Sequence, residues 1–177
     1  MTTDTTTEAR TVQVHRVYIK APAQKVWDAI VDPSWTTRYG YAAPVEYDLR
    51  PGGTFRSTPS DEMRRSAEQY GFTMGDVIVD GEVVEADPPR LLKQTWRMVM
   101  DPATLAEGFS TLTYTITEQA GGVCKLTITH DVTGMPALAA MVQGPEADEP
   151  DSQGAGGWPW ILSDLKSLLE TGSTLAG

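Results

Sequence analysis

The sequence contains a single cysteine and two histidines among 177 residues, and this scarcity excludes several kinds of protein. The lone Cys124 cannot form an intramolecular disulfide or a cysteine-rich metal knuckle, and the alternating residues around it predict a small core side chain. His15 and His130 fall in separate predicted strands, and no carboxylate spacing beside them completes a metal-ligand set. We therefore expect no metal site and no cofactor.

Basic residues are also scarce, because 14 lysines and arginines stand against 24 aspartates and glutamates, for a formal net charge of −10. A field of this sign repels nucleic acid and anionic lipid, and no basic cluster reverses it locally. No apolar run approaches the length of a membrane span, and residues 1–10 lack the apolar core of a signal peptide. We expect a cytoplasmic protein that binds no nucleic acid and does not insert into membranes.

Familiar catalytic motifs are missing as well, since the sequence has no glycine-rich phosphate loop and no nucleophile elbow. It does have the composition of a globular protein, with 40% hydrophobic residues and five tryptophans. Its length fits one domain. We predict a flexible tail at residues 1–10, a single domain at residues 11–172 and a C-terminal tail at residues 173–177.

Alternating apolar and polar residues predict strands over most of the chain. One strand is expected at residues 11–20, followed later by about six antiparallel strands. These are joined by hairpins that turn at residues 51–53, at 87–89 and at 121–122, where the sequence reads Pro-Gly-Gly, Asp-Pro-Pro and Gly-Gly. This pattern is typical of an antiparallel sheet.

Helices are predicted near both ends of the domain. Residues 22–33 form a short amphipathic helix that stops at a proline, and residues 158–169 carry apolar side chains three and four apart. Residues 59–75 read as a surface excursion or short helix, and residues 135–157 read as a long acidic connector. Glycines before residue 158 predict a flexible approach to the last helix.

The strands from residue 92 onward predict one buried face, because their even positions are mostly apolar. The stripe of the last helix should pack against that face, which gives an α+β protein. The stripe comprises Trp158, Ile161, Leu162, Leu165, Leu168 and Leu169. The facing sheet positions include Leu92, Gln94, Trp96, Met98, Met100, Leu112, Tyr114, Ile116, Cys124, Leu126, Ile128, His130 and Val132.

A set of short motifs spanning residues 12–172 resembles the START-like (SRPBCC) superfamily, in the group related to the C-terminal domain of the activator of Hsp90 ATPase. The motifs are Ala21-Pro22 with Val26-Trp27, Asp48 to Gly53, Gly81 to Glu85, Asp87 to Leu92, Trp96, and Gly157-Trp158 with Leu162, Leu165-Lys166 and Leu169-Glu170. The set is fairly specific, whereas each motif alone is common.

The resemblance implies a helix-grip fold, in which a curved antiparallel sheet of about six to seven strands wraps around a long C-terminal helix. It also implies a cavity between sheet and helix for an apolar small molecule. Members of this superfamily include lipid and polyketide binders, aromatase/cyclases and co-chaperone domains, so the resemblance implies the fold without fixing the activity.

Six residues on the facing surfaces are predicted to bind a ligand: Trp96, Met98, Tyr114, His130, Trp158 and Leu162. His130 interrupts an apolar strand face, so it is the candidate general base, and Tyr114 on the preceding strand is the candidate proton donor. The same pattern also fits a core histidine with a hydrogen-bonded partner and a core tyrosine. No residue is assigned a catalytic role beyond these two candidates.

We expect the protein to bind a small hydrophobic ligand, which is lipid-, polyketide- or aromatic-like. One alternative is an enzyme, a cyclase, dehydratase or hydrolase acting on a polyketide-like or aromatic substrate with His130 as base. A second alternative is a co-chaperone-like domain that binds a protein partner such as Hsp90, and a homodimer also fits. The sequence leans away from an enzyme because it shows only one plausible base.

Overall fold

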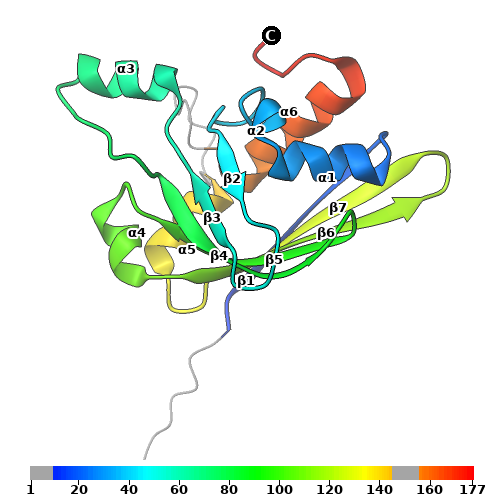
Figure 1. The fold of residues 1–177 in the computed structure, drawn as a ribbon, viewed down its shortest axis with the longest axis horizontal. Coiled ribbons are helices and arrows are strands. Elements are labelled where there is room, and N and C mark those ends of the chain that lie inside the picture. Colours follow the sequence, from blue (N-terminus) through cyan, green and yellow to red (C-terminus); the bar gives the residue numbers. More distant parts are fainter. Residues whose placement is uncertain (1–9, 145–155) are drawn as a thin grey trace, which may run out of the picture.

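A computed structural model describes residues 10–144 and 156–177, and within them a single antiparallel sheet is flanked by helices (Figure 1). The sheet has seven strands in the order β1-β7-β6-β5-β4-β3-β2. The strands are β1 (Val12–Ile19), β2 (Val45–Tyr47), β3 (Thr54–Ser57), β4 (Val79–Asp87), β5 (Leu91–Met98), β6 (Ser110–Gln119) and β7 (Val123–Asp131). The helices are α1 (Ala23–Val31), α2 (Pro33–Thr36), α3 (Asp61–Gln69), α4 (Pro102–Glu107), α5 (Pro136–Gln143) and α6 (Gly157–Thr171).

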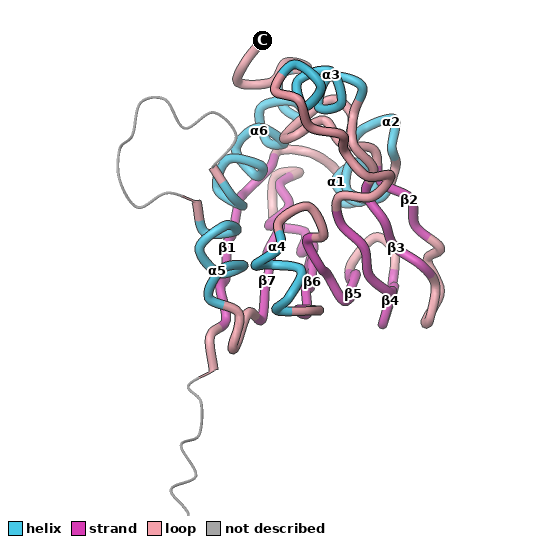
Figure 2. Tube along the Cα trace, turned by 90° about the vertical axis from the view of Figure 1, so that its left-hand side faces the viewer, coloured by secondary structure: helices cyan, strands magenta, loops and turns pink. Residues whose placement is uncertain are grey.

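The helices are not spread evenly over the sheet. Helices α1, α2 and α6 lie over its concave face, α4 and α5 lie toward one end, and α3 stands away from the strands (Figures 1 and 2). Helix α3 has no buried residue, which agrees with the predicted surface excursion. The predicted α+β architecture, with a curved antiparallel sheet and a C-terminal helix, is confirmed.

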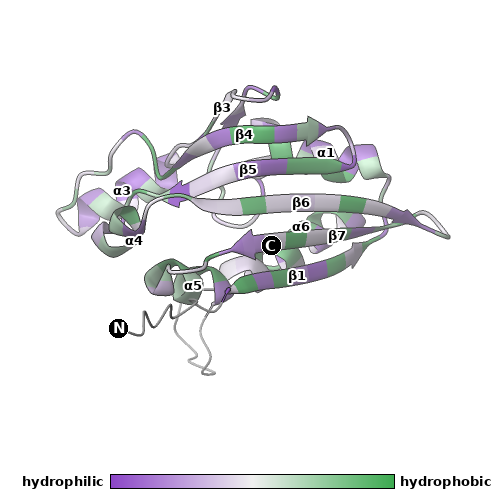
Figure 3. Ribbon diagram, turned by 90° about the horizontal axis from the view of Figure 1, so that it is seen from below, coloured by the Kyte–Doolittle hydropathy of each residue, from purple (hydrophilic) through white to green (hydrophobic). Residues whose placement is uncertain are grey.

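The predicted alternation of faces is also confirmed. In β7 every even residue from Cys124 to His130 is buried, and each odd residue is only partly buried. In Figure 3, hydrophobic and hydrophilic residues follow one another along the strands, as expected of a sheet with one buried face and one face turned to water. The core therefore lies between the concave face and the helices that cover it.

Helix α1 ends where the sequence predicts, and its end leaves one carbonyl without its usual N–H donor. A distant tyrosine supplies the missing hydrogen bond. The carbonyl of Ala29 would normally accept a hydrogen bond from the amide four residues later, but that residue is Pro33, which has no N–H. The hydroxyl of Tyr39 donates to this carbonyl at 2.6 Å instead. Tyr39 is thereby fixed beneath the helices.

Helix α6 packs on the sheet through the predicted stripe, with Trp158, Leu162, Leu165, Leu168 and Leu169 buried. Its one buried carboxylate, Asp164, accepts hydrogen bonds from two other segments. One comes from the amide of Gly40, at 2.7 Å, and the other from the amide of Leu175, at 2.8 Å. Residues of the predicted C-terminal tail are thus joined to α6.

Two helices were not predicted from the sequence. Helix α4 begins at Pro102 with an Asp101 cap, and α5 occupies the first part of the segment that reads as an acidic connector. The carboxylate of Glu107 caps α5, because its two oxygens accept from the amides of Ala137 at 2.7 Å and Leu138 at 2.9 Å. Residues 145–155 of the predicted connector, including Gly154, lie outside the described residues.

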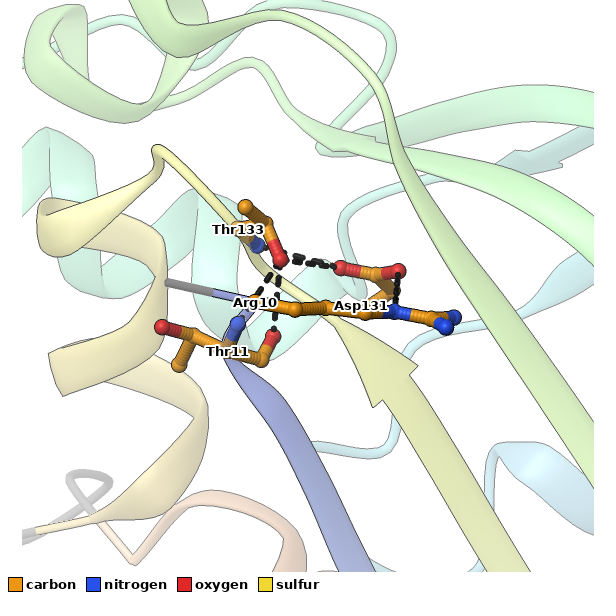
Figure 4. A network of polar contacts seen from close by, with 4 residues as sticks. All are labelled: Arg10, Thr11, Asp131 and Thr133. Carbon is orange, nitrogen blue, oxygen red and sulfur yellow. Dashed lines mark hydrogen bonds and ion pairs between the residues drawn. The ribbon is translucent and has the colours of Figure 1, made fainter. Parts of the chain in front are cut away.

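The start of the domain is held by a polar network between β1 and the end of β7 (Figure 4). The amide of Thr11 donates to Thr133 Oγ1 at 2.8 Å, and the Thr133 hydroxyl donates to Asp131 Oδ1 at 2.7 Å. Arg10 pairs with the other oxygen of Asp131 at 3.1 Å. This network ties down the chain just where the predicted tail ends.

Candidate functional site

A cavity of about 930 Å³ lies between the concave face of the sheet and helix α6. Its walls come from every layer of the fold: the inner residues of β2 to β7, the turn after α2, helix α5 and the first half of α6. Most of its wall is apolar.

Five of the six predicted ligand-binding residues line this cavity: Trp96, Met98, Tyr114, Trp158 and Leu162. They come from β5, β6 and α6, and the alternation of the strands with the helical stripe brings them together. The ring of Tyr114 meets that of Trp158 edge to face, with centroids 6.1 Å apart. Their role in binding stays a prediction, because lining a cavity is not the same as holding a ligand.

The sixth residue, His130, lies behind the cavity wall and not among the residues that line it. Its side chain is fully buried, and its ring meets Trp96 and Trp158 edge to face, at 5.5 and 6.0 Å between centroids. The indole N–H of Trp158 donates to Nδ1 of His130 at 3.1 Å. Its other nitrogen, Nε2, lies 2.7 Å from the hydroxyl oxygen of Ser110.

These contacts fix the tautomer of His130. An indole nitrogen is only a donor, so Nδ1 is an acceptor without a proton and the proton resides on Nε2. Nε2–H therefore donates to Ser110, whose own hydroxyl donates to the carbonyl of Trp96 at 2.8 Å. The chain of bonds joins α6, β7, β6 and β5 with every member paired.

The pKa of His130 is lowered to about 4, first by burial and then by the nearby His15, while Asp131 acts in the opposite direction. The imidazole is therefore neutral at neutral pH. A general base needs a free nitrogen within reach of substrate and a pKa near the working pH. His130 meets neither condition, and its geometry is that of a core histidine that holds Trp158 in place.

Three tyrosines that the sequence did not single out also line the cavity, Tyr39, Tyr41 and Tyr47. Tyr39 follows α2, and Tyr47 ends β2, with its ring stacked on Phe55 at 4.6 Å. The hydroxyl of Tyr47 donates to Oε1 of Gln94 at 2.9 Å. Burial raises the pKa of Tyr39, Tyr47 and Tyr114, so all three hydroxyls keep their protons.

Helix α5 is another wall that sequence reasoning missed, since Ala140, Met141 and Val142 line the cavity. It packs against the start of α6 at Gly157, whose φ is +58°. A Cβ at this position would lie 2.4 Å from the carbonyl oxygen of Val142, so only glycine fits. Gly157 is a close contact between two helices, whereas the sequence suggested a flexible approach. The sequence feature that could have predicted helix α5 is Pro136, which precedes an apolar run and suits the first turn of a helix.

Other kinds of site are not evident among the described residues. Within residues 10–144 and 156–177 no group of three or more His, Cys, Asp or Glu side chains is placed to hold a metal ion. No helix in these ranges is long and apolar enough to cross a bilayer. Cys124 is buried, as predicted.

The fold and the cavity together define a class, the helix-grip α+β proteins with a space between sheet and C-terminal helix. The chain belongs to the family described as Activator of Hsp90 ATPase homolog 1-like protein, whose model matches residues 20–170. This confirms the resemblance found in the sequence. A comparison with curated proteins found no match.

Several solved structures share the fold. Protein MLL2253 from Mesorhizobium loti has a TM-score of 0.58 at 22% identity, over 90% of this chain and 96% of that one. The Aha1 dimer from Colwellia psychrerythraea has a TM-score of 0.57 at 15% identity, over 92% and 98%. DynU16, from the dynemicin biosynthetic locus, has a TM-score of 0.58 at 20% identity, over 92% and 48%. At these identities the likeness establishes the fold alone.

Proposed function

We propose that the protein binds a small hydrophobic molecule, of lipid, polyketide or aromatic type, in the cavity between the sheet and α6. The observation that carries the proposal is the cavity itself, with its volume of about 930 Å³ and its apolar wall. Small-molecule sites are concave, mostly apolar and typically about 300–1,000 Å³. The presence of the same fold in DynU16, from a biosynthetic locus, agrees with a ligand of this kind.

The direct test uses diphenylhexatriene, a hydrocarbon whose fluorescence rises in apolar surroundings. We expect submillimolar binding to the native protein, weakened in Leu162→Ala and Trp96→Ala because both variants remove cavity wall. Those substitutions also remove core packing, so a third variant is needed. Ala140→Trp places a large ring into the cavity from an exposed position on α5.

The matched control is Ala103→Trp, which adds the same ring at an exposed position on α4 away from the cavity. Loss of probe binding in Ala140→Trp with retention in Ala103→Trp supports the proposal. No binding of the probe to the native protein, or equal binding by both variants, argues against a ligand in this cavity.

The enzymatic alternative with His130 as base receives no support from the geometry. Both ring nitrogens are engaged by Trp158 and Ser110, and the ring lies behind the cavity wall. Tyr114 lines the cavity, but alone it offers a neutral hydroxyl and no base. Among the described residues that line the cavity, the one carboxylate is that of Asp101, which caps helix α4.

A protein-interaction role of the Hsp90-activator type stays a prediction, as does a homodimer. The family name is the reason to test the first, and the solved Aha1 dimer is the reason to test the second. Purified Hsp90 mixed with the protein would show a raised ATPase rate if the first holds. Sedimentation of the protein alone would report the second.

A further inference from the structure

Aromatic side chains are concentrated around the cavity. The chain has five tryptophans, six tyrosines and three phenylalanines, and half of them line the cavity, although the lining residues make up less than a fifth of the chain. They come from the turn after α2, from β2, β3, β5 and β6, and from α6. Among the described buried hydrophobic residues that do not line the cavity, Trp27 is the single aromatic. The aromatic content is therefore a property of this wall and not of the core in general.

Three of these rings have their polar ends bonded behind the wall. The hydroxyl of Tyr47 donates to Oε1 of Gln94 at 2.9 Å, and the indole N–H of Trp158 donates to Nδ1 of His130 at 3.1 Å. Neither Gln94 nor His130 lines the cavity. The hydroxyl of Tyr39 bonds in the same way to a backbone carbonyl of α1, at 2.6 Å. Because the protein satisfies these polar atoms, the three side chains offer a ligand the carbon surface of their rings.

The rings also pack against one another, which holds them in place. Tyr47 stacks on Phe55 with centroids 4.6 Å apart, and Tyr114 meets Trp158 edge to face at 6.1 Å. These distances are typical of favourable aromatic pairs, and aromatic side chains have few rotatable bonds to order. A planar ring in the cavity can add contacts of the same kind. It also loses less conformational freedom on binding than a flexible chain does.

The charge of the wall restricts the ligand further. Among the described residues that line the cavity there is no Lys, Arg or His. The one carboxylate, that of Asp101, already accepts a hydrogen bond from the amide of Thr104 at 3.0 Å as the cap of α4. A carboxylate or phosphate enclosed in this space would be buried without a counter-charge, which is costly. The wall therefore favours an uncharged ligand.

We infer that the cavity selects an uncharged compound of rigid fused aromatic rings over an acyl chain of the same size. This inference rests on the proposed binding function and names the class of ligand. The wall rings Phe55 and Tyr114 are specificity-determining residues, because they come from separate strands and each packs against another ring of the wall. The aliphatic part of the wall supplies apolar contact that does not distinguish a ring from a chain.

The experiment compares three uncharged hydrocarbons of ten carbons each by displacement of diphenylhexatriene: naphthalene, decalin and decane. Each affinity is corrected for the partition of the compound from water to cyclohexane, so that a cavity that is merely apolar gives three equal values. We expect naphthalene to bind about tenfold tighter than decalin or decane after this correction, the scale of one or two edge-to-face ring pairs. Naphthalene-2-carboxylate should bind more weakly than naphthalene.

Phe55→Leu and Tyr114→Leu each remove one ring from the wall and keep an apolar side chain. The preference for naphthalene over decalin should fall by about threefold in each variant. Met98→Leu is the matched control, because it changes a lining side chain that has no ring. The readout is a ratio of two ligands within one variant, so a general loosening of the wall does not imitate the effect. Tyr114 is only partly buried, so Tyr114→Leu provides the test even where Phe55→Leu does not fold.

The outcomes separate this inference from the binding function. Binding of diphenylhexatriene with equal corrected affinities for naphthalene, decalin and decane overturns the selection of rings and leaves the binding function standing. An equal fall of the preference in Met98→Leu, or no fall in either ring variant, also overturns it. Tight binding of the carboxylate overturns the preference for an uncharged ligand. Failure of diphenylhexatriene to bind overturns the binding function and this inference with it.

Discussion

The indole Nε1 of Trp158 donates a hydrogen bond to Nδ1 of His130 across 3.1 Å, which links the first turn of α6 to strand β7. Both residues were predicted to face a ligand, but only Trp158 lines the cavity in the structure. Trp158 presents its ring to the cavity, whereas His130 holds that ring from behind. The stability of the cavity wall therefore depends on a residue outside it.

Trp158→Phe tests this relationship. The substitution keeps an aromatic ring but removes the N–H, so Nδ1 of His130 is left buried without a donor, and we expect a loss of about 1–2 kcal/mol in the free energy of unfolding. Urea denaturation measures it. Trp160→Phe is the control, because Trp160 is half-buried on the same helix and is not joined to His130. Equal losses in the two variants would contradict the role of the hydrogen bond.

The pH dependence of stability tests whether His130 is buried as a neutral imidazole. Since burial lowers its folded pKa to about 4 from 6.5, the unfolded state binds more protons between these values. Stability therefore rises with pH through this window and is lost as pH falls from about 6.5 to about 4, by up to about 3 kcal/mol. NMR of the two histidine rings should show His15 titrating first and His130 as the neutral Nε2–H tautomer at pH 6. A His130 midpoint near 6.5 would show that the ring is not enclosed as described.

Tyr39→Phe should destabilise the protein. Its hydroxyl is the donor for the Ala29 carbonyl, which Pro33 cannot serve, so the variant leaves a buried acceptor unpaired at a cost of about 1–3 kcal/mol. Tyr114→Phe makes the same chemical change at a hydroxyl without a described partner and should leave the melting temperature nearly unchanged. Thermal unfolding of both variants is the measurement. A larger loss in Tyr114→Phe would reverse this assignment of roles.

Gly157→Ala should be among the most damaging small substitutions. Both Gly157 and Gly172 have positive φ, at +58° and +81°, so alanine at either costs about 1–2 kcal/mol in backbone strain. Only at Gly157 does the added Cβ meet the backbone of α5, whereas at Gly172 no atom lies within 4 Å. Denaturant unfolding should show a loss at least about 2 kcal/mol larger in Gly157→Ala. Equal losses would mean that α5 moves aside without cost.

The sequence was sufficient for the parts of the fold that local patterns control. Alternation placed Leu126, Ile128 and His130 on the buried face because a strand repeats every two residues. It could not show the partners of His130, since Ser110 and Trp158 are 20 and 28 residues away and are brought to it only by the folded sheet and helix. A periodic pattern reports burial but not hydrogen bonding.

The cavity positions of Tyr39 and Tyr47 also could not be predicted from local sequence patterns. Tyr47 lies in a strand of three residues, too short for alternation to be read with security, and Tyr39 lies in a turn. The position of Tyr39 depends on a carbonyl that lacks an amide partner ten residues earlier, which is a tertiary requirement. Helix α5 was missed because the acidic, glycine-rich residues that follow it dominate the composition of the segment.

The two hydrogen bonds of Asp164 set the axial position of α6. With its carboxylate held by Gly40 on one side and Leu175 on the other, the helix can neither rotate nor slide without breaking a buried bond. The helical rise from Asp164 back to Trp158 is about 9 Å, so anchoring Asp164 also fixes the height of Trp158 along the helix axis. Two backbone amides thereby hold Trp158, Ile161 and Leu162 in position in the cavity wall.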